Sequence, residues 1–393
     1  MKKICHVAPG QRAHHMRIFH RFCWSMAKAG HQVELIAHAE GDTQEYGVRI
    51  HDLGALGQPT LRWNLWARFS RNLKAYTLAV RAHADIYFFY SPEFIPFALL
   101  LKRVSGKPVV FDCMEDFIGY ARQRAGIPNA LRGTFAFIVR QVFRFAARRL
   151  DFITVADRGT ENQFLEHTSK VITIFNFPRL DLFPLLPANR TDNCEFDLVY
   201  HGTLPRYFLA LLLEIDQQLL LLGKKVSWYL FGTSPQFDWF RAELNRSKAE
   251  DRFSLGGLFP HDQVYSEVQR ARIGIIPLPL LPKFLNNIPQ KLFEYMALGL
   301  PVVLSDLPPS RPFIAGNDVG IMVDPTDPAA YAQAIVKLLN DPNACQAMGR
   351  RGRMLVEQKY NWEIESEKLM LLVKELTTPR PESDLAAQNT APG

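Results

Sequence analysis

Residues 288–303 read IPQKLFEYMALGLPVV, and this stretch carries the most specific pattern in the chain of 393 residues. Pro289 suits the first turn of a helix, and Gly299 suits the position just beyond its last turn. The apolar run Pro301–Leu304 then predicts a buried strand. A helix that leads at once into a strand is one half of a βαβ unit, so the stretch predicts a parallel sheet.

Two charged residues share one face of this predicted helix. Lys291 and Glu294 lie three positions apart near its N-terminus. That terminus offers unpaired N–H groups and a positive dipole to an anion, and Lys291 adds a formal charge. Glu294 has enough acceptors to take both hydroxyls of a ribose. Together they indicate a nucleotide site, whereas the alternative is an ordinary αβ unit whose Lys and Glu form a solvated pair.

Short apolar strands alternate with helical patterns along both halves of the chain. This alternation predicts a doubly wound α/β domain in each half, with ligand loops at the carboxyl ends of the strands and a cleft where the domains face each other. A connector rich in proline and asparagine, residues 177–196, separates the halves. The expected strands are Lys3–Ala8, Val33–Ala37, Ile86–Phe89, Val109–Phe111 and Phe152–Val155, then Phe196–His201, Val226–Phe231, Ile273–Pro277, Val302–Leu304 and Ile321–Val323.

The C-terminal end contains one more predicted helix. Residues 362–376 place Leu369, Leu372 and Val373 on one stripe, which needs a partner surface. Residues 377–393 are polar and contain prolines, so we expect a disordered tail.

Composition excludes several classes of protein. With 48% hydrophobic and 22% charged residues the chain is not a disordered or fibrous sequence. Its five cysteines lie at no disulfide-scaffold or zinc-ligand spacing, which favours a reducing compartment. Neither a signal h-region nor about 18 uninterrupted apolar residues occur, so we expect a cytoplasmic protein without a membrane span.

The positive charge belongs to the first half. Residues 1–190 contain 26 Lys and Arg against 15 Asp and Glu, whereas the remainder contains 20 against 24. Arg140, Arg144 and Arg148 recur on an aromatic-rich helix, and a second segment combines Arg62, Arg68, Arg71 and Lys74 with Trp63 and Trp66. Cationic helices with aromatics suit an anionic lipid surface, although a solvated helix face is the alternative. No nucleic-acid-binding motif accompanies the charge.

Four further loops follow predicted strands. In His201–Arg206, Gly202 permits close approach of a ligand, and Arg206 suits a diphosphate, although an ordinary βα turn has the same features. The loops Tyr90–Phe94 and Phe111–Asp116 carry acids that suit either a site or helix caps. His14 and His15 lie with Arg12 and Arg17 in the first βα loop and suit an acceptor, whereas no further ligand at helical spacing supports a metal.

In order along the chain, these segments resemble the motifs of the retaining glycosyltransferases of family 4, up to about residue 376. The resemblance rests on Arg17–His20 and Leu35–Ala37, on Ala84–Glu93, on Phe111–Asp116, on Asn176-Phe177-Pro178, and most of all on Lys291–Ser305, which is similar to the family's KLFEYMAxGLPVVxS.

The resemblance implies a GT-B fold of two Rossmann-like domains and transfer of a sugar from a nucleoside diphosphate sugar with retention of configuration, without a metal or cofactor. It implies an acceptor domain at 1–180, a donor domain at 181–361, and a helix at 362–376 that crosses back to the first domain. By position, Arg206, Lys291 and Glu294 would be catalytic. Gly202, Thr203, Asn286, Asn287, Ile288, Pro289 and Glu294 would bind the donor, and Gly10, His14, His15, Arg17, Glu93, Glu115 and Asp116 the acceptor.

The chain departs from the family pattern where donor sugar and acceptor meet. A loop histidine is replaced by Met114, an acid by Asn286, and an arginine by Thr203. We therefore carry three hypotheses: a transferase that builds surface polysaccharide on a lipid-linked or saccharide acceptor at the inner face of the cell membrane, a non-catalytic nucleotide-sugar-binding protein, and a nucleotide-sugar epimerase. A nicotinamide dehydrogenase is disfavoured because no GxGxxG follows the first strand of either half.

Overall fold

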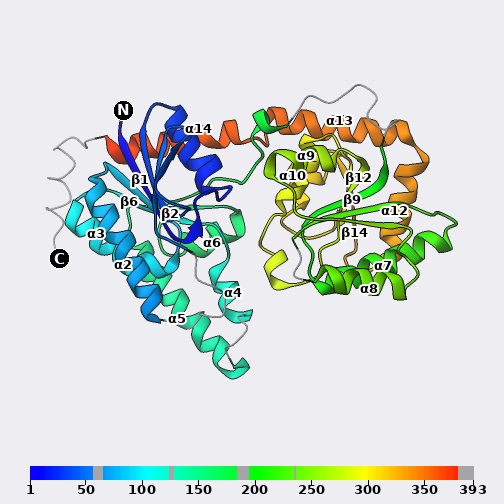
Figure 1. Cartoon of the computed structure of the whole chain (residues 1–393), viewed down its shortest axis with the longest axis horizontal. Coiled ribbons are helices and arrows are strands. Elements are labelled where there is room, and N and C mark those ends of the chain that lie inside the picture. The colour runs from blue at the N-terminus through cyan, green and yellow to red at the C-terminus, as the bar shows by residue number, and fades with distance from the viewer. Residues whose placement is uncertain (56–64, 124–127, 184–193, 234–235, 379–393) are drawn as a thin grey trace. The chain divides into compact units, whose positions relative to one another are not determined.

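The structure, a computed structural model, describes residues 1–55, 65–123, 128–183, 194–233 and 236–378 (Figure 1). The described chain forms two units. The N-terminal unit contains Met1–Phe175 together with the chain from Glu365, and the C-terminal unit contains Asn176–Ile364. Arg62 and Trp63, residues 184–193 of the expected connector, and the expected tail from residue 379 lie outside the described residues.

An eight-stranded sheet forms the centre of the N-terminal unit, in the order β3-β4-β2-β1-β5-β6-β7-β8. Every neighbouring pair is parallel except β3 and β4. The strands are β1 (Lys3–Arg12), β2 (Gln32–His38), β3 (Thr43–Glu45), β4 (Val48–Asp52), β5 (Ile86–Phe89), β6 (Val109–Cys113), β7 (Phe152–Val155) and β8 (Val171–Thr173).

Alternating strand residues give this sheet two apolar faces, and helices cover both. Cys5, Phe89 and Phe111 pack with α2 (Leu65–Ala82), α3 (Ile95–Ser105), α5 (Asn129–Ala147) and α6 (Arg158–Leu165). On the opposite face, Phe88 contacts Phe22 of a π-helix (Ile18–Cys23) that continues into α1 (Trp24–Lys28). A short helix, α4 (Phe117–Gln123), follows β6.

The C-terminal unit has a six-stranded, wholly parallel sheet in the order β11-β10-β9-β12-β13-β14. Its strands are β9 (Phe196–Thr203), β10 (Trp228–Thr233), β11 (Phe253–Gly256), β12 (Ala271–Ile276), β13 (Val302–Ser305) and β14 (Gly320–Val323). Its helices are α7 (Arg206–Leu221), α8 (Phe237–Arg246), α9 (His261–Val268), α10 (Gln290–Ala297), α11 (Arg311–Ile314), α12 (Pro328–Asn340) and α13 (Pro342–Gln358). Two parallel α/β sheets confirm the expected fold class.

Four strands were not predicted: β3, β4, β8 and β11. Three of them lie at sheet edges, and β4 reads VRIHD, with only two fully buried residues. Short or polar strands at an edge lack the continuous apolar run that marks a central parallel strand, so their sequences do not reveal them.

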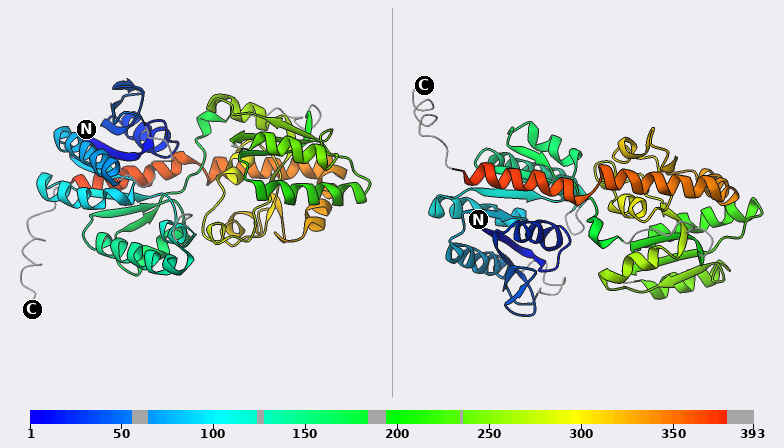
Figure 2. Two further views of the ribbon diagram at one scale, coloured as in Figure 1. Left: turned by 60° about the horizontal axis from the view of Figure 1, so that its bottom comes forward. Right: turned by 90° about the horizontal axis from the view of Figure 1, so that it is seen from above.

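The last helix, α14 (Trp362–Thr377), belongs to the N-terminal unit from Glu365 onward. Figure 2 shows it in red beside the strands of that unit. Leu369, Leu372 and Val373 are buried, as the apolar stripe requires. Glu365 accepts a hydrogen bond from the backbone N–H of Phe175 at 2.9 Å, and Lys2 donates to the carbonyl of Thr377 at 3.0 Å. Among the helices of the described segments, none is long and apolar enough to cross a membrane.

A buried ion pair connects the π-helix segment to the sheet of the N-terminal unit. Arg17 and Asp112 are 2% and 0% exposed, and two guanidinium nitrogens reach the two carboxylate oxygens at 2.8 and 2.7 Å. Arg17 also donates to the carbonyl of Ile174, and the hydroxyl of Thr154 donates to Asp112 at 2.6 Å. These partners satisfy both charges, as burial demands.

We expect Asp112→Ala to destabilise the N-terminal unit by roughly 3–5 kcal/mol, because it leaves the Arg17 charge buried without a counter-charge. The control is Glu166→Ala, which removes an exposed ion pair with Arg140 and should cost at most about 1 kcal/mol. Urea-induced unfolding followed by circular dichroism measures both. Equal losses of unfolding free energy in the two variants would contradict a stabilising role for the buried Arg17–Asp112 pair.

Candidate functional site

The end of β9 and the start of α10 meet in the C-terminal unit. Gly202 has a φ of +119°, which L side chains rarely adopt, and a Cβ built there would lie 2.9 Å from Nζ of Lys291. Any larger residue would therefore displace the lysine. The structure thus places Gly202 beside Lys291, and their roles in donor binding stay predictions.

The Lys291 ammonium has no hydrogen-bonding or ion-pair partner among the residues that the structure describes. It lies 5.0 Å from the centroid of the Tyr200 ring, a weak cation–π contact. Burial lowers the pKa of Lys291, and the nearby charge of Glu294 opposes that shift. Burial penalises the charged form of the lysine. An anion bound beside the ammonium would offset this penalty through a charge-assisted hydrogen bond. The solvated Lys–Glu pair considered as the alternative is not formed within 4.0 Å.

Glu294 bonds instead to the end of β9. Its Oε2 lies 2.9 Å from Nε2 of His201, and Nδ1 of His201 lies 3.2 Å from the hydroxyl of Tyr295. The backbone N–H of His201 also donates to that hydroxyl at 3.3 Å. The carboxylate that the sequence assigns to a ribose is thus held next to the glycine turn.

The N-terminus of α10 has no side-chain cap. Pro289 occupies the N-cap position and makes no side-chain hydrogen bond to the helix. By contrast, Asp327 and Asp341 cap α12 and α13 in the same unit. A helix start without an acidic cap, beside an unpartnered lysine, is suited to an external anion.

The loop before α10 contains a second unsatisfied group. Asn287 is partly buried, and its Oδ1 is a buried acceptor with no hydrogen-bond partner in the described chain. Asn286, Ile288 and Pro289 are also partly buried. A buried acceptor without a donor costs free energy, so a ligand that donates to Asn287 would be favoured.

Arg206 is not brought together with Lys291 or Glu294 by any interaction among the described residues. It begins α7, is exposed, and stacks its guanidinium 4.9 Å from the centroid of the Trp239 ring on α8. Thr203 is exposed at the end of β9. Both lie at the carboxyl end of β9, where the sequence places them, but their binding roles stay predictions.

Gly232, which was not among the predicted site residues, pairs with Gly202 across β9 and β10. Its φ is +131°, and a Cβ there would lie 2.1 Å from the carbonyl oxygen of Gly202. Both strands end in Gly-Thr, at 202–203 and 232–233. That repeat is the signal by which the second glycine could have been found.

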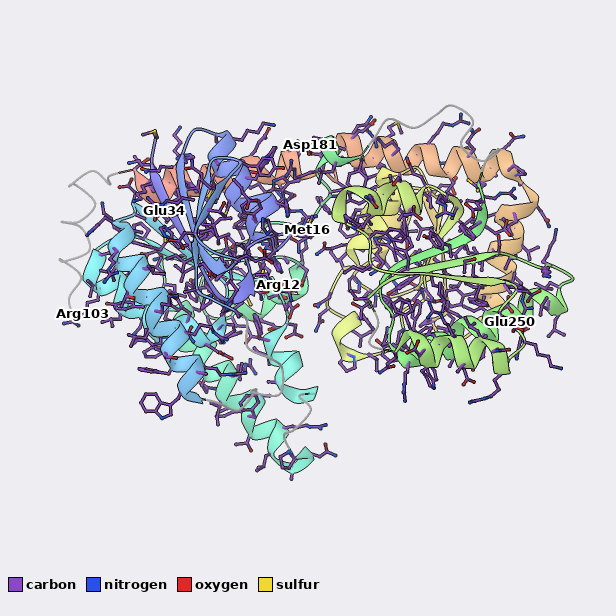
Figure 3. The ribbon with its side chains drawn as sticks, in the orientation of Figure 1. Arg12, Met16, Glu34, Arg103, Asp181 and Glu250 are labelled. Carbon is purple, nitrogen blue, oxygen red and sulfur yellow. The ribbon has the colours of Figure 1, made fainter. Side chains whose placement is uncertain are left out.

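The predicted acceptor residues lie in the N-terminal unit, around the carboxyl ends of β1, β5 and β6. The loop between Arg12 and Met16, both labelled in Figure 3, contains His14, which pairs with Glu45 at 2.9 Å. Glu93 pairs with Arg68 of α2 at 2.6 Å. Gly10 approaches the hydroxyl of Ser91, and Glu115 is exposed. Their acceptor role stays a prediction.

Two acids and a histidine are more enclosed. Asp116 is buried and accepts a hydrogen bond from the backbone N–H of Gly119 at 2.8 Å, so it caps α4. Nδ1 of His15 is a buried nitrogen without a hydrogen-bond partner among described residues, and burial lowers the pKa of His15. His15 therefore remains suited to a ligand, whereas Asp116 already supports the fold.

Arg17 needs a correction. We expected it to bind an acceptor, but it is 2% exposed and its guanidinium is bound to Asp112 and to backbone carbonyls. A buried, fully engaged arginine has no donor to offer a ligand in this conformation, so we assign Arg17 to the stability of the unit. Across the described residues, no three His, Cys, Asp or Glu side chains are grouped to hold a metal ion.

Residues 195–341, which contain the whole Gly202, Lys291 and Glu294 arrangement, match the family described as "Glycosyl transferases group 1". Over this range the chain is similar to the group 1 glycosyl transferases. Its fold is GT-B, because sucrose-phosphate synthase from Thermosynechococcus elongatus superposes with a TM-score of 0.74, at 16% identity over 96% of this chain and 99% of that one.

Two further comparisons give the same direction. Anabaena HepE in complex with UDP has a TM-score of 0.68, at 12% identity over 95% of this chain and 100% of HepE. Glycogen synthase from Mycobacterium tuberculosis is 24% identical over 132 residues, which are 34% of this chain and 31% of that protein. The match thus spans about a third of the length of this curated relative.

Replacing Gly202 with alanine should weaken nucleotide binding by roughly tenfold or more, because the methyl group strains the backbone and displaces Lys291. Gly257→Ala is the matched control, since a Cβ there meets nothing within 4 Å. Isothermal titration with UDP and GDP measures both variants. Wild-type affinity in Gly202→Ala would show that the close approach to Lys291 is unimportant.

Proposed function

We propose that this chain transfers a sugar from a nucleoside diphosphate sugar to a hydroxyl acceptor, with retention of the anomeric configuration. The observation that carries the proposal is the unpartnered ammonium of Lys291, beside an uncapped helix start and a carboxylate held by His201. A diphosphate supplies the missing charge, and the attached ribose supplies hydroxyl donors for Glu294.

In this mechanism the chain stabilises the leaving group. As the bond between sugar and diphosphate breaks, negative charge grows on the diphosphate, and Lys291 with the α10 N-terminus offsets it. Arg206 would add a second cation by leaving Trp239. The Asn286–Pro289 loop would contact the transferred sugar. Because these groups supply the positive charge, we expect turnover to continue in the presence of EDTA.

Lys291→Ala should lower the rate of sugar transfer by about 10²–10³, as removal of a transition-state donor does elsewhere. Glu294→Gln should chiefly raise the KM for the sugar donor, because the Glu294 carboxylate accepts hydrogen bonds from the ribose hydroxyls. Lys337→Ala, which removes an exposed lysine from α12, is the control and should leave the rate unchanged. The assay offers a panel of UDP-, GDP- and dTDP-sugars and measures nucleoside diphosphate release and product. HepE has been solved with UDP and with UDP-glucose, so these come first.

The same assay separates the alternatives that Met114 and Asn286 motivate. Donor binding without turnover, even with acceptors present, would favour a non-catalytic binding protein. A free 2-epimer formed without acceptor would favour an epimerase. No binding to any nucleotide sugar would contradict the proposal and both alternatives together.

For the acceptor, we propose a lipid-linked or saccharide hydroxyl at an anionic membrane surface, in cell-surface polysaccharide synthesis at the cytoplasmic face. The N-terminal unit supports this, because α5 exposes Phe137 and Phe145 at 61% and 47%. Arg144 lies about two turns along from Phe137 on α5, Arg148 is the C-cap residue of that helix, and Trp66 of α2 is 78% exposed. Aromatics among arginines on an outward helix face suit a lipid headgroup region.

Charge reversal of Arg144 and Arg148 to Glu should weaken binding to anionic vesicles by at least about tenfold, given about 1 kcal/mol for each basic residue near the surface. The control reverses Arg241 and Arg246, which are exposed on α8 of the other unit. Co-sedimentation with phosphatidylglycerol-containing and pure phosphatidylcholine vesicles measures binding. Equal binding to both vesicle types would contradict a lipid-binding face.

A further inference from the structure

His201 is a buried histidine whose two ring nitrogens both contact residues of α10. It is 8% exposed, and its ring stacks on Phe231 and meets the Tyr295 ring edge-on, with centroid separations of 5.7 and 5.3 Å. Nε2 contacts Glu294 and Nδ1 contacts the Tyr295 hydroxyl. The packing therefore allows the imidazole little rotation.

The chemistry of the partners determines which atoms carry protons. An ionised carboxylate only accepts hydrogen bonds, so Nε2 must carry the proton that points at Glu294. In a neutral ring Nδ1 then accepts, and the one proton of the Tyr295 hydroxyl has two acceptors in reach, Nδ1 at 3.2 Å and the carbonyl of Val199 at 3.3 Å. Tyr295 is 0% exposed and is held close to the carbonyl of Val199, so the whole chain of contacts is anchored to β9.

The Glu294 carboxylate could pair with Lys291 or bond to His201. Only the bond to His201 leaves the Lys291 ammonium available to a diphosphate. Lys291 shares its helix face three positions earlier, where a Glu and a Lys ordinarily pair. Such a pair would neutralise the ammonium that the diphosphate requires. The bond to His201 holds the carboxylate at β9 instead, and the structure contains no Lys291–Glu294 ion pair within the described residues.

We infer that His201 is a positioning residue: it orients Glu294 to read the ribose hydroxyls and keeps that carboxylate away from Lys291. The inference rests on the proposed function, since it assigns the ribose selectivity of the same site. A carboxylate has more acceptor sites than the single proton of His201 uses, so a ribose diol can also donate to it. His201 itself need not touch the donor.

Two variants of similar size test this role. The amide group of His201→Asn lies near the position of Nδ1, so its oxygen can accept from the Tyr295 hydroxyl, but the side chain does not reach Glu294. His201→Gln places its amide nitrogen near Nε2 and retains the donor to Glu294. Isothermal titration measures the affinities of both variants and of the wild type for UDP, GDP and their 2′-deoxy and 3′-deoxy analogues.

We expect the wild type to bind the ribonucleotide roughly tenfold or more tightly than its deoxy analogues. A hydrogen bond to a charged group contributes enough binding free energy for that difference. His201→Asn should lose most of that preference and bind all of these diphosphates more weakly, whereas His201→Gln should retain it. Glu294→Gln in the His201→Asn background should cause little further loss, because both changes remove the same contact. Thermal unfolding of each variant verifies that it is folded.

The outcomes separate the inference from the proposed function. If no diphosphate binds to the wild type, the proposed function fails. If the wild type binds but does not discriminate, or if His201→Asn discriminates as well as the wild type, the role of His201 is wrong while nucleotide binding stands. Equal loss in His201→Asn and His201→Gln would also overturn it, because a merely structural histidine would be rescued by neither.

Discussion

The close packing of Lys291 against Gly202 is the constraint on which the candidate site depends. With a positive φ and no side chain, Gly202 lets the lysine of one βα unit lie against the end of the neighbouring unit's strand. Gly232 then allows the next strand to approach Gly202 in turn. Two glycines at adjacent strand ends thus create the space in which a charged side chain and a helix start are exposed to the same ligand.

This arrangement leaves polar groups unsatisfied within an otherwise well-bonded unit. The ammonium of Lys291, Oδ1 of Asn287 and the uncapped start of α10 lie in or beside one helix turn, whereas α12 and α13 carry aspartate caps. Unsatisfied groups lower stability, and their concentration at one place is typical of a site that a ligand completes. The histidine and tyrosine behind Glu294 are fully engaged, which gives the site a rigid base.

The N-terminal unit shows the opposite use of charge. Arg17 and Asp112 satisfy each other in the interior, and their side chains connect the first βα loop to β6. His15, in the same loop, keeps an unpartnered ring nitrogen. Neighbouring residues of one loop therefore have different roles. The buried, hydrogen-bonded Arg17 stabilises the unit, whereas His15 remains suited to a ligand.

The sequence by itself determined the two parallel α/β domains, the helix at Lys291 and Glu294, and the glycine turn at Gly202, because apolar periodicity and glycine or proline positions are local properties of a chain. Only the tertiary structure decided that Arg17 forms a buried ion pair with Asp112, that Gly232 pairs with Gly202, and that Glu294 bonds to His201 rather than to Lys291. Those choices depend on which segments pack side by side and on how much water each charge loses, and neither quantity can be read from neighbours in sequence.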